Sequence, residues 1–158
     1  MTDDQLRQII LDAYDARPET KEYFEFFLNP DVDRLLSRLE ARLQKEYQRT
    51  KWGRSKVRTT VIKRCLNDVI TLNPGPAVVI DALMLALSGL ALTDKFVELN
   101  EAQKKLGVWI LKKVVDCADS AMIFSEIAPK IEEFMHNPAH RNSFMRYLAD
   151  NLELPFRH

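Results

Sequence analysis

The sequence of 158 residues contains little glycine and little cysteine. Four glycines leave little material for hairpin turns, and no segment alternates apolar and polar residues in the way that is typical of a strand. The two cysteines, Cys65 and Cys117, form neither a disulfide framework nor a metal cluster, and they suit a reducing compartment. The chain opens without the basic and apolar run of a signal peptide, so we expect a cytoplasmic protein.

Catalytic and metal-binding patterns are also missing. The sequence has no Gly-rich phosphate loop, no G-x-S-x-G elbow, no H-E-x-x-H and no C-x-x-C. Glu132, His136 and His140 follow the spacing of metal ligands on one helix, but Pro138 places His140 on a different helix from His136. We predict no catalytic residue, no metal and no cofactor, with an enzyme built around Asp81 or the His136 region as the remote alternative.

What the sequence does have is apolar residues at helical spacing along almost its whole length. The spacing predicts one all-α domain over residues 1–158, with about seven to eight helices in a globular bundle or a short stack of helix pairs. In the first half of the chain, we expect a helix that Thr2 caps and that ends near Arg17, a helix over 20–28, a helix from Pro30 to about Tyr47, and a helix that Ser55 caps and that ends at Asn73. In the second half, we expect a helix over 76–92, a helix after a connection at 93–100, a helix that Pro129 kinks or divides, and a helix that starts at Asn137.

The helix expected over 76–92 is apolar on nearly every side. It is shorter than the roughly 20 residues that span a bilayer, so we expect it to be buried at the centre of the fold. Truncation of a central residue such as Leu85 should then cost about 2–5 kcal/mol. Asp81 lies early in this helix, where burial would require a nearby partner or the positive end of the helix dipole.

The short helix over 20–28 carries an aromatic density that predicts a packed face, formed by Tyr23, Phe24, Phe26 and Phe27. Truncation of Phe27 should therefore also cost about 2–5 kcal/mol.

Charge is the most unevenly distributed property of the sequence. Residues 34–64 contain 11 Lys or Arg and only two Glu, a local balance of +9 in a chain with no net charge. Because the cations of the expected third helix recur at i, i+4, i+8, i+11 and i+15, they form one stripe. Residues 30–72 are thus predicted to form a basic helical hairpin. Its candidate residues for binding nucleic acid or an acidic partner are Arg34, Arg38, Arg42, Lys45, Arg49, Lys51, Trp52, Arg54, Lys56, Lys63 and Arg64.

Three interpretations of this pattern stay open. The leading hypothesis is a non-enzymatic helical interaction or scaffold module with a protein partner or a second copy of itself. The alternative is binding of the phosphate backbone of a nucleic acid, with Trp52 stacking on a base. The third is a solvated basic face that the acidic remainder of the chain balances. A membrane role is not expected, because no exposed aromatic and leucine residues border the stripe.

The order of several segments resembles one known family. The segments are Leu11-Asp12-Ala13-Tyr14, Glu22-Tyr23-Phe24-Glu25-Phe26-Phe27-Leu28-Asn29-Pro30-Asp31, the basic stretch through Ser55-Lys56, Asn73-Pro74-Gly75-Pro76, and Asp81-Ala82-Leu83-Met84-Leu85. Over roughly residues 8–92 the chain is similar to an uncharacterised family of small all-helical bacterial proteins, a domain of unknown function. This resemblance implies an all-helical fold and a bacterial cytoplasmic setting, and it implies no activity or catalytic residue.

Overall fold

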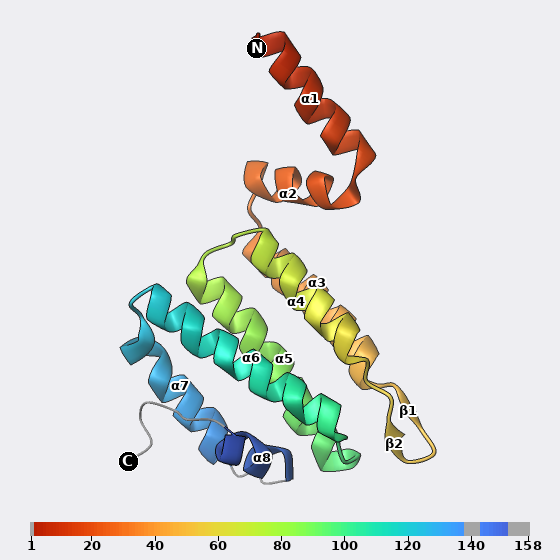
Figure 1. Ribbon diagram of the computed structural model, residues 1–158, viewed down its shortest axis with the longest axis vertical. Helices are drawn as coiled ribbons and strands as arrows, with labels where there is room; N and C mark the ends of the chain where they lie inside the picture. Colours follow the sequence, from red (N-terminus) through yellow and green to blue (C-terminus); the bar gives the residue numbers. More distant parts are fainter. Residues whose placement is uncertain (1, 138–142, 152–158) are drawn as a thin grey trace.

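Eight helices and one short β-hairpin make up residues 2–137 and 143–151, the part of the chain that the computed structural model describes. In chain order they are α1 (Asp3–Ala16), α2 (Pro18–Leu28), α3 (Val32–Tyr47), β1 (Thr50–Lys51), β2 (Arg54–Ser55), α4 (Thr59–Thr71), α5 (Pro76–Phe96), α6 (Glu101–Ser120), α7 (Phe124–His136) and α8 (Ser143–Asn151). Helices α3 and α4 pack together, α5 and α6 form the next layer, and α7 and α8 cover α6 (Figure 1). The predicted all-helical fold is confirmed.

Helix α5 is the centre of the fold, as the sequence predicts, although it continues four residues further, to Phe96. It packs against α3, α4, α6 and α8, and its fully buried side chains include Ile80, Leu83, Leu87 and Leu90. By length and hydropathy alone, it is also the one helix among the described residues that could cross a membrane. Its packing against four other helices is that of the core helix of a globular fold.

Two helix starts carry strong local signals. Gln5 N donates to Thr2 Oγ1 at 3.2 Å and Thr2 N donates to Gln5 Oε1 at 2.9 Å, so the predicted Thr2 cap is a complete capping box. The start of α3 lies two residues later than predicted. Asp31, rather than Asn29, is the N-cap, and its carboxylate accepts from Arg34 N at 3.0 Å.

The β-hairpin between α3 and α4 differs from the prediction of a helix capped by Ser55. Trp52 and Gly53 both have positive φ, 57° and 71°, and together they form the tight turn that joins β1 to β2. Such a turn suits the twist of a two-stranded ribbon, and a single glycine supplies half of it. Ser55 is consequently buried at the end of β2, and α4 begins only at Thr59.

Helices α1 and α2, which we call the arm, project beyond the other helices (Figure 1). They pack on each other, yet neither helix buries a single residue. The predicted packed aromatic face is therefore wrong for Phe27, whose surface is 70% exposed, and for Tyr23, which is 40% exposed. The two helices cover each other on one side only, and no further layer encloses the aromatic face of α2. The rings of Tyr23 and Phe27 instead stack on each other, with their centroids 6.5 Å apart.

Of the two aspartates of α5, only the one near its C-terminal end is buried. Asp81, near the start of α5, is exposed, whereas Asp94, in the last turn of α5, is buried. Its carboxylate accepts from Leu99 N at 2.9 Å and from Phe144 N at 3.1 Å, and so it ties the start of α8 to the end of α5. Pro129 lies inside the single helix α7 and does not divide it, while the predicted helix start at Asn137-Pro138 falls largely outside the described residues.

Candidate functional site

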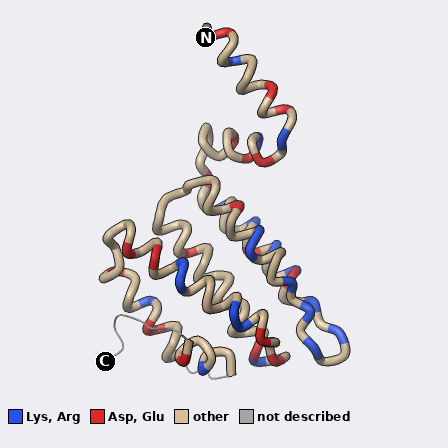
Figure 2. The backbone as a smooth tube through the Cα atoms, in the orientation of Figure 1, with Lys and Arg blue, Asp and Glu red and all other residues tan. Residues whose placement is uncertain are grey.

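The predicted basic hairpin consists of α3, β1, β2 and α4 (Figure 2). Helices α3 and α4 run antiparallel and pack together, and the β-hairpin extends beyond their common end. Lys and Arg positions, coloured blue along the backbone in Figure 2, follow α3 and recur in the β-hairpin. The structure thus brings most of the predicted cations to one edge of the molecule.

A buried glutamate that the sequence analysis missed anchors this edge. Glu46 is only 4% exposed, and its carboxylate accepts from Arg58 N at 2.7 Å, from Arg58 Nε at 3.0 Å and from Arg58 Nη2 at 2.8 Å. These hydrogen bonds with Arg58 hold the pKa of the Glu46 carboxyl below its ordinary value. Because Arg58 is the N-cap residue of α4, this pair fixes the end of α3 to the start of α4.

Three of the predicted site residues have partners inside the molecule. Arg42 Nη2 lies 3.5 Å from Asp68 Oδ2 on α4, and Arg49 Nε lies 3.6 Å from Glu46 Oε1. The Lys63 ammonium stands 5.1 Å from the centre of the Trp109 ring on α6, which is a cation–π contact. Lys63 therefore points toward α6 and does not extend the stripe of α3.

Seven predicted cations have no ion pair within the described residues, and all seven are exposed. They are Arg34, Arg38, Lys45, Lys51, Arg54, Lys56 and Arg64. An unpaired positive charge can bind an anion without the breaking of an existing ion pair, whereas a paired one must first be released.

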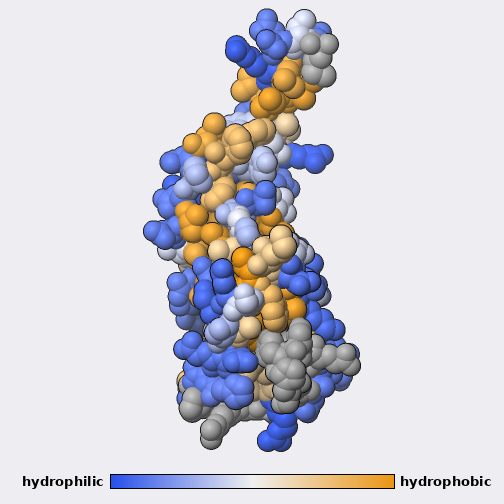
Figure 3. Space-filling model, turned by 90° about the vertical axis from the view of Figure 1, so that its left-hand side faces the viewer, coloured by the Kyte–Doolittle hydropathy of each residue, from blue (hydrophilic) through white to orange (hydrophobic). Residues whose placement is uncertain are grey.

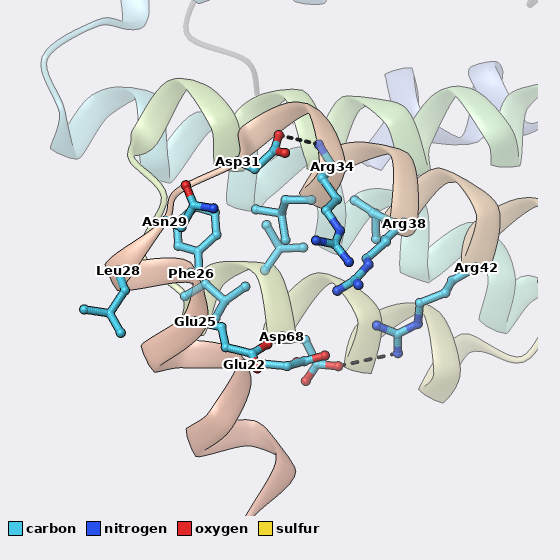
Figure 4. Close-up of a pocket in the computed structure, with 14 residues that line it drawn as sticks. Glu22, Glu25, Phe26, Leu28, Asn29, Asp31, Arg34, Arg38, Arg42 and Asp68 are labelled. Carbon is cyan, nitrogen blue, oxygen red and sulfur yellow. Dashed lines mark hydrogen bonds and ion pairs between the residues drawn. The ribbon is translucent and has the colours of Figure 1, made fainter. Parts of the chain in front are cut away.

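Arg34 and Arg38 line an open cleft of about 620 Å³ between α2, α3 and α4. Figure 4 shows them projecting from α3 on one side of this cleft, with Glu22 and Glu25 of α2 and Asp68 of α4 on the other side. The acidic residues of the arm thus face this half of the stripe and weaken its positive field. The strongest uncompensated positive charge lies at the other half, around the β-hairpin.

The tip of the β-hairpin combines an aromatic ring with cations. Trp52 is 88% exposed, and it stands between Lys51 and Arg54 in the turn. Lys56 follows directly after β2, and its backbone N–H donates to Arg49 O at 2.8 Å, which continues the pairing of the two strands. We call Lys51, Trp52, Arg54 and Lys56, together with Lys45 in the last turn of α3, the hairpin tip.

The described residues offer little chemistry of other kinds. They contain no group of three His, Cys, Asp or Glu side chains that is suitable for a metal ion. His136 Nδ1 lies 2.9 Å from Glu132 O, and His140 is outside the described residues. Burial raises the pKa of both the Cys65 and the Cys117 thiol, which disfavours the thiolate that a nucleophile needs.

A second surface feature, an apolar groove, was not predicted from the sequence. It has a volume of about 350 Å³ and lies between the C-terminal ends of α3 and α5. Its lining includes Tyr47, Leu85, Leu92, Phe96 and Val97, and Phe96 is 83% exposed. The helix expected over 76–92 stops short of the last turn of α5, so Phe96 and Val97 were expected in a connection and not at the edge of a groove.

Comparison with known proteins identifies one family. A model for a family of unknown function (DUF6155) matches residues 1–142, which confirms the predicted resemblance and extends it through α6 and α7. No curated protein and no solved structure matches the chain. Since the match covers the arm, the basic hairpin and the central helix, the chain belongs to the DUF6155 family.

Proposed function

We propose that the chain is a non-enzymatic interaction module that binds another protein chain through the exposed apolar face of the arm. One observation carries this proposal: α1 and α2 bury no residue, yet they expose seven large apolar side chains. These are Leu6, Ile9, Ile10, Leu11, Tyr23, Phe27 and Leu28. In Figure 3, apolar surface, coloured orange, lies over the arm between polar side chains. Soluble monomers seldom leave contiguous apolar patches of this kind uncovered.

The spacing of these residues supports recognition by a helix face. Leu6, Ile9 and Ile10 stand at i, i+3 and i+4 on α1, and Tyr23 and Phe27 stand at i and i+4 on α2. This is the anchor spacing with which an amphipathic helix enters an apolar groove. Burial of such side chains stabilises a complex by roughly 25 cal/mol for each Å² of apolar surface removed from water.

Site-specific photo-crosslinking in the cell that produces the protein tests this proposal. A photoreactive benzoylphenylalanine replaces Phe27 in one variant and the exposed residue Lys112 of α6 in a matched control. We expect a crosslinked product of higher mass at position 27 and none at position 112. Absence of any protein crosslink at position 27, and also at Ile9, would overturn the proposal.

The hairpin tip favours a second candidate function, binding of a phosphate backbone. Its four cations, Lys45, Lys51, Arg54 and Lys56, are exposed and without an ion pair in the described residues, and Trp52 offers a stacking face. Each phosphate neutralised by such a cation releases condensed counterions, so the affinity falls steeply with salt. Stacking on one exposed aromatic ring adds about 1–3 kcal/mol per base.

Fluorescence anisotropy with labelled single-stranded and duplex oligonucleotides at two salt concentrations tests this second function. One variant changes the four tip cations to Gln, and the control changes Lys105, Lys112, Lys130 and Arg146 to Gln, so that both lose the same charge. We expect salt-sensitive binding that the tip variant loses and the control keeps. Binding that both variants lose equally, or no binding at low salt, would exclude this function.

A further inference from the structure

The arm presents its apolar face together with negative charge. Residues 3–28 contain seven Asp or Glu and three Lys or Arg, a net charge of −4. Direct pairing of two arms would bring two such charges together, and like charges in an interface oppose association. The favourable partner for the arm is therefore a surface that is apolar and bordered by cations.

The apolar groove at the ends of α3 and α5 has this character. Leu92 and Phe96 are exposed at its edge, and Glu40 is the one charged residue that lines it. The acids next to its lining in the sequence, Glu46, Asp94 and Glu98, are already held by Arg58, by backbone N–H groups and by Lys104. Three lysines also stand next to its lining in the sequence: Lys45 follows Gln44, Lys51 follows Thr50, and Lys95 precedes Phe96. All three are exposed and have no ion pair among the described residues.

The groove and the arm of one chain lie at opposite ends of α3. The arm joins the N-terminal end of α3 through Asn29 and Pro30, whereas the groove is formed by Tyr47 and its neighbours at the C-terminal end. A helix of 16 residues is about 24 Å long, and the arm projects from its N-terminal end away from the groove (Figure 1), so in this structure the two do not meet within one chain. The groove that receives an arm must belong to another copy.

We propose, on the basis of the proposed function, that the partner of the arm is a second copy of this chain, and that the arm of each copy docks into the apolar groove of the other. Reciprocal docking of this kind closes a two-fold dimer, because each copy gives one arm and receives one. Docking in one direction only would generate an open chain of copies.

The available surface suits such a dimer. A stable specific interface buries roughly 1,200–2,000 Å² in total. Two of the seven exposed apolar side chains of one arm are aromatic and all seven are only partly exposed, so together they offer on the order of several hundred Å². Two arms therefore supply part of the surface that a specific interface buries, and the contact of each arm extends beyond the groove itself.

Sedimentation velocity of the purified full chain over a micromolar concentration series tests the proposal. The variants are Phe27→Asp in the arm, Phe96→Asp in the groove, and Met122→Asp as control, since Met122 is 91% exposed and lies at the end of α6, outside both surfaces. All three positions are exposed, and circular dichroism checks that each variant folds. We expect dimers for the wild type and the control, and monomers for the arm and groove variants.

A mixture of the arm and groove variants sharpens the test. The mixture retains one intact pair, the arm of the Phe96→Asp chain with the groove of the Phe27→Asp chain, so we expect dimers to reappear with weakened affinity. Pairing between two arms predicts instead that the Phe96→Asp chain alone stays dimeric, and this result would overturn the proposal. A wild type that stays monomeric over the whole series would also overturn it.

The crosslinking experiment separates this proposal from the proposed function. A crosslink from position 27 to a second copy is the expected result. A crosslink to a different protein, with a monomeric wild type in solution, would refute self-association and leave the interaction module in place. Absence of every crosslink at position 27 would refute both.

Discussion

Replacement of Gly89 by alanine tests the packing of α3 on α5 most directly, because helix propensity and packing predict opposite signs. Gly89 lies in the interior of α5, where alanine is favoured over glycine by about 0.8–1.0 kcal/mol. A Cβ atom at this position would, however, overlap the ring of Tyr47 on α3. That ring cannot easily give way, because Tyr47 is largely buried and its hydroxyl donates to Ala86 O at 2.6 Å.

The magnitude follows from these contacts. Overpacking of a well-packed site costs about 1–3 kcal/mol, and loss of the Tyr47 hydrogen bond adds about 0.5–1.5 kcal/mol. After subtraction of the helix-propensity gain, Gly89→Ala should destabilise the protein by about 0.5–3.5 kcal/mol. For a domain of this size the melting temperature should fall by roughly 2–4 °C for each kcal/mol.

Urea denaturation of four proteins measures this effect: the wild type, Gly89→Ala, Tyr47→Ala and the double variant. With the ring removed, the same Gly89→Ala change should become neutral or stabilising, since only the helix propensity remains. A single Gly89→Ala variant that is as stable as the wild type, or more stable, would refute the close packing of Tyr47 on Gly89.

Three further predictions follow from the buried groups and the exposed arm. The pKa of Glu46 is lowered in the folded state, so its pair with Arg58 stabilises the protein at pH values above the unfolded-state pKa of about 4.3. In urea denaturation, the wild type should therefore be more stable than Glu46→Gln at neutral pH. This difference in stability should shrink as the pH falls below about 4.3. Asp94→Ala should cost about 1–3 kcal/mol for each buried N–H left without an acceptor, and hydrogen exchange should show the loss first at the start of α8. Leu87→Ala should cost about 2–5 kcal/mol, whereas Phe27→Ala in dilute solution should cost under about 1 kcal/mol, as thermal melts can establish.

The spacing of apolar residues predicted those helices whose signals lie close together in the sequence. The central helix and the Thr2 cap were recognisable because their signals lie within one or two helical turns. The β-hairpin was missed because its turn depends on positive φ at Trp52 as well as at Gly53, and a tryptophan rarely signals that conformation. Exposure of Phe27 was missed because a pattern shows which face is apolar but not whether another layer covers it.

The candidate site was predictable only in part. The excess of Lys and Arg between residues 34 and 64 located the basic edge, since charge can be counted along a chain. The fold was needed to tell which cations have no ion pair. Arg42 pairs with Asp68, and Lys63 contacts Trp109 on α6, a helix far from Lys63 in the sequence. The apolar groove joins residues of α3 and α5 that are about 40 positions apart, and no local pattern in the sequence reports their approach.

The lack of burial in α1 and α2 also sets where the chain opens most easily. Isolated helices of fewer than about 12–15 residues are marginal in water, and α1 and α2 have 14 and 11 residues. Their amide protons should exchange with solvent far faster than those of α5, whose opening requires disruption of the whole core. A protease should accordingly cut first before Val32, and the helical layers from α3 onward should survive as a fragment. A partner that covers the arm, as proposed, would therefore also supply free energy that keeps it helical.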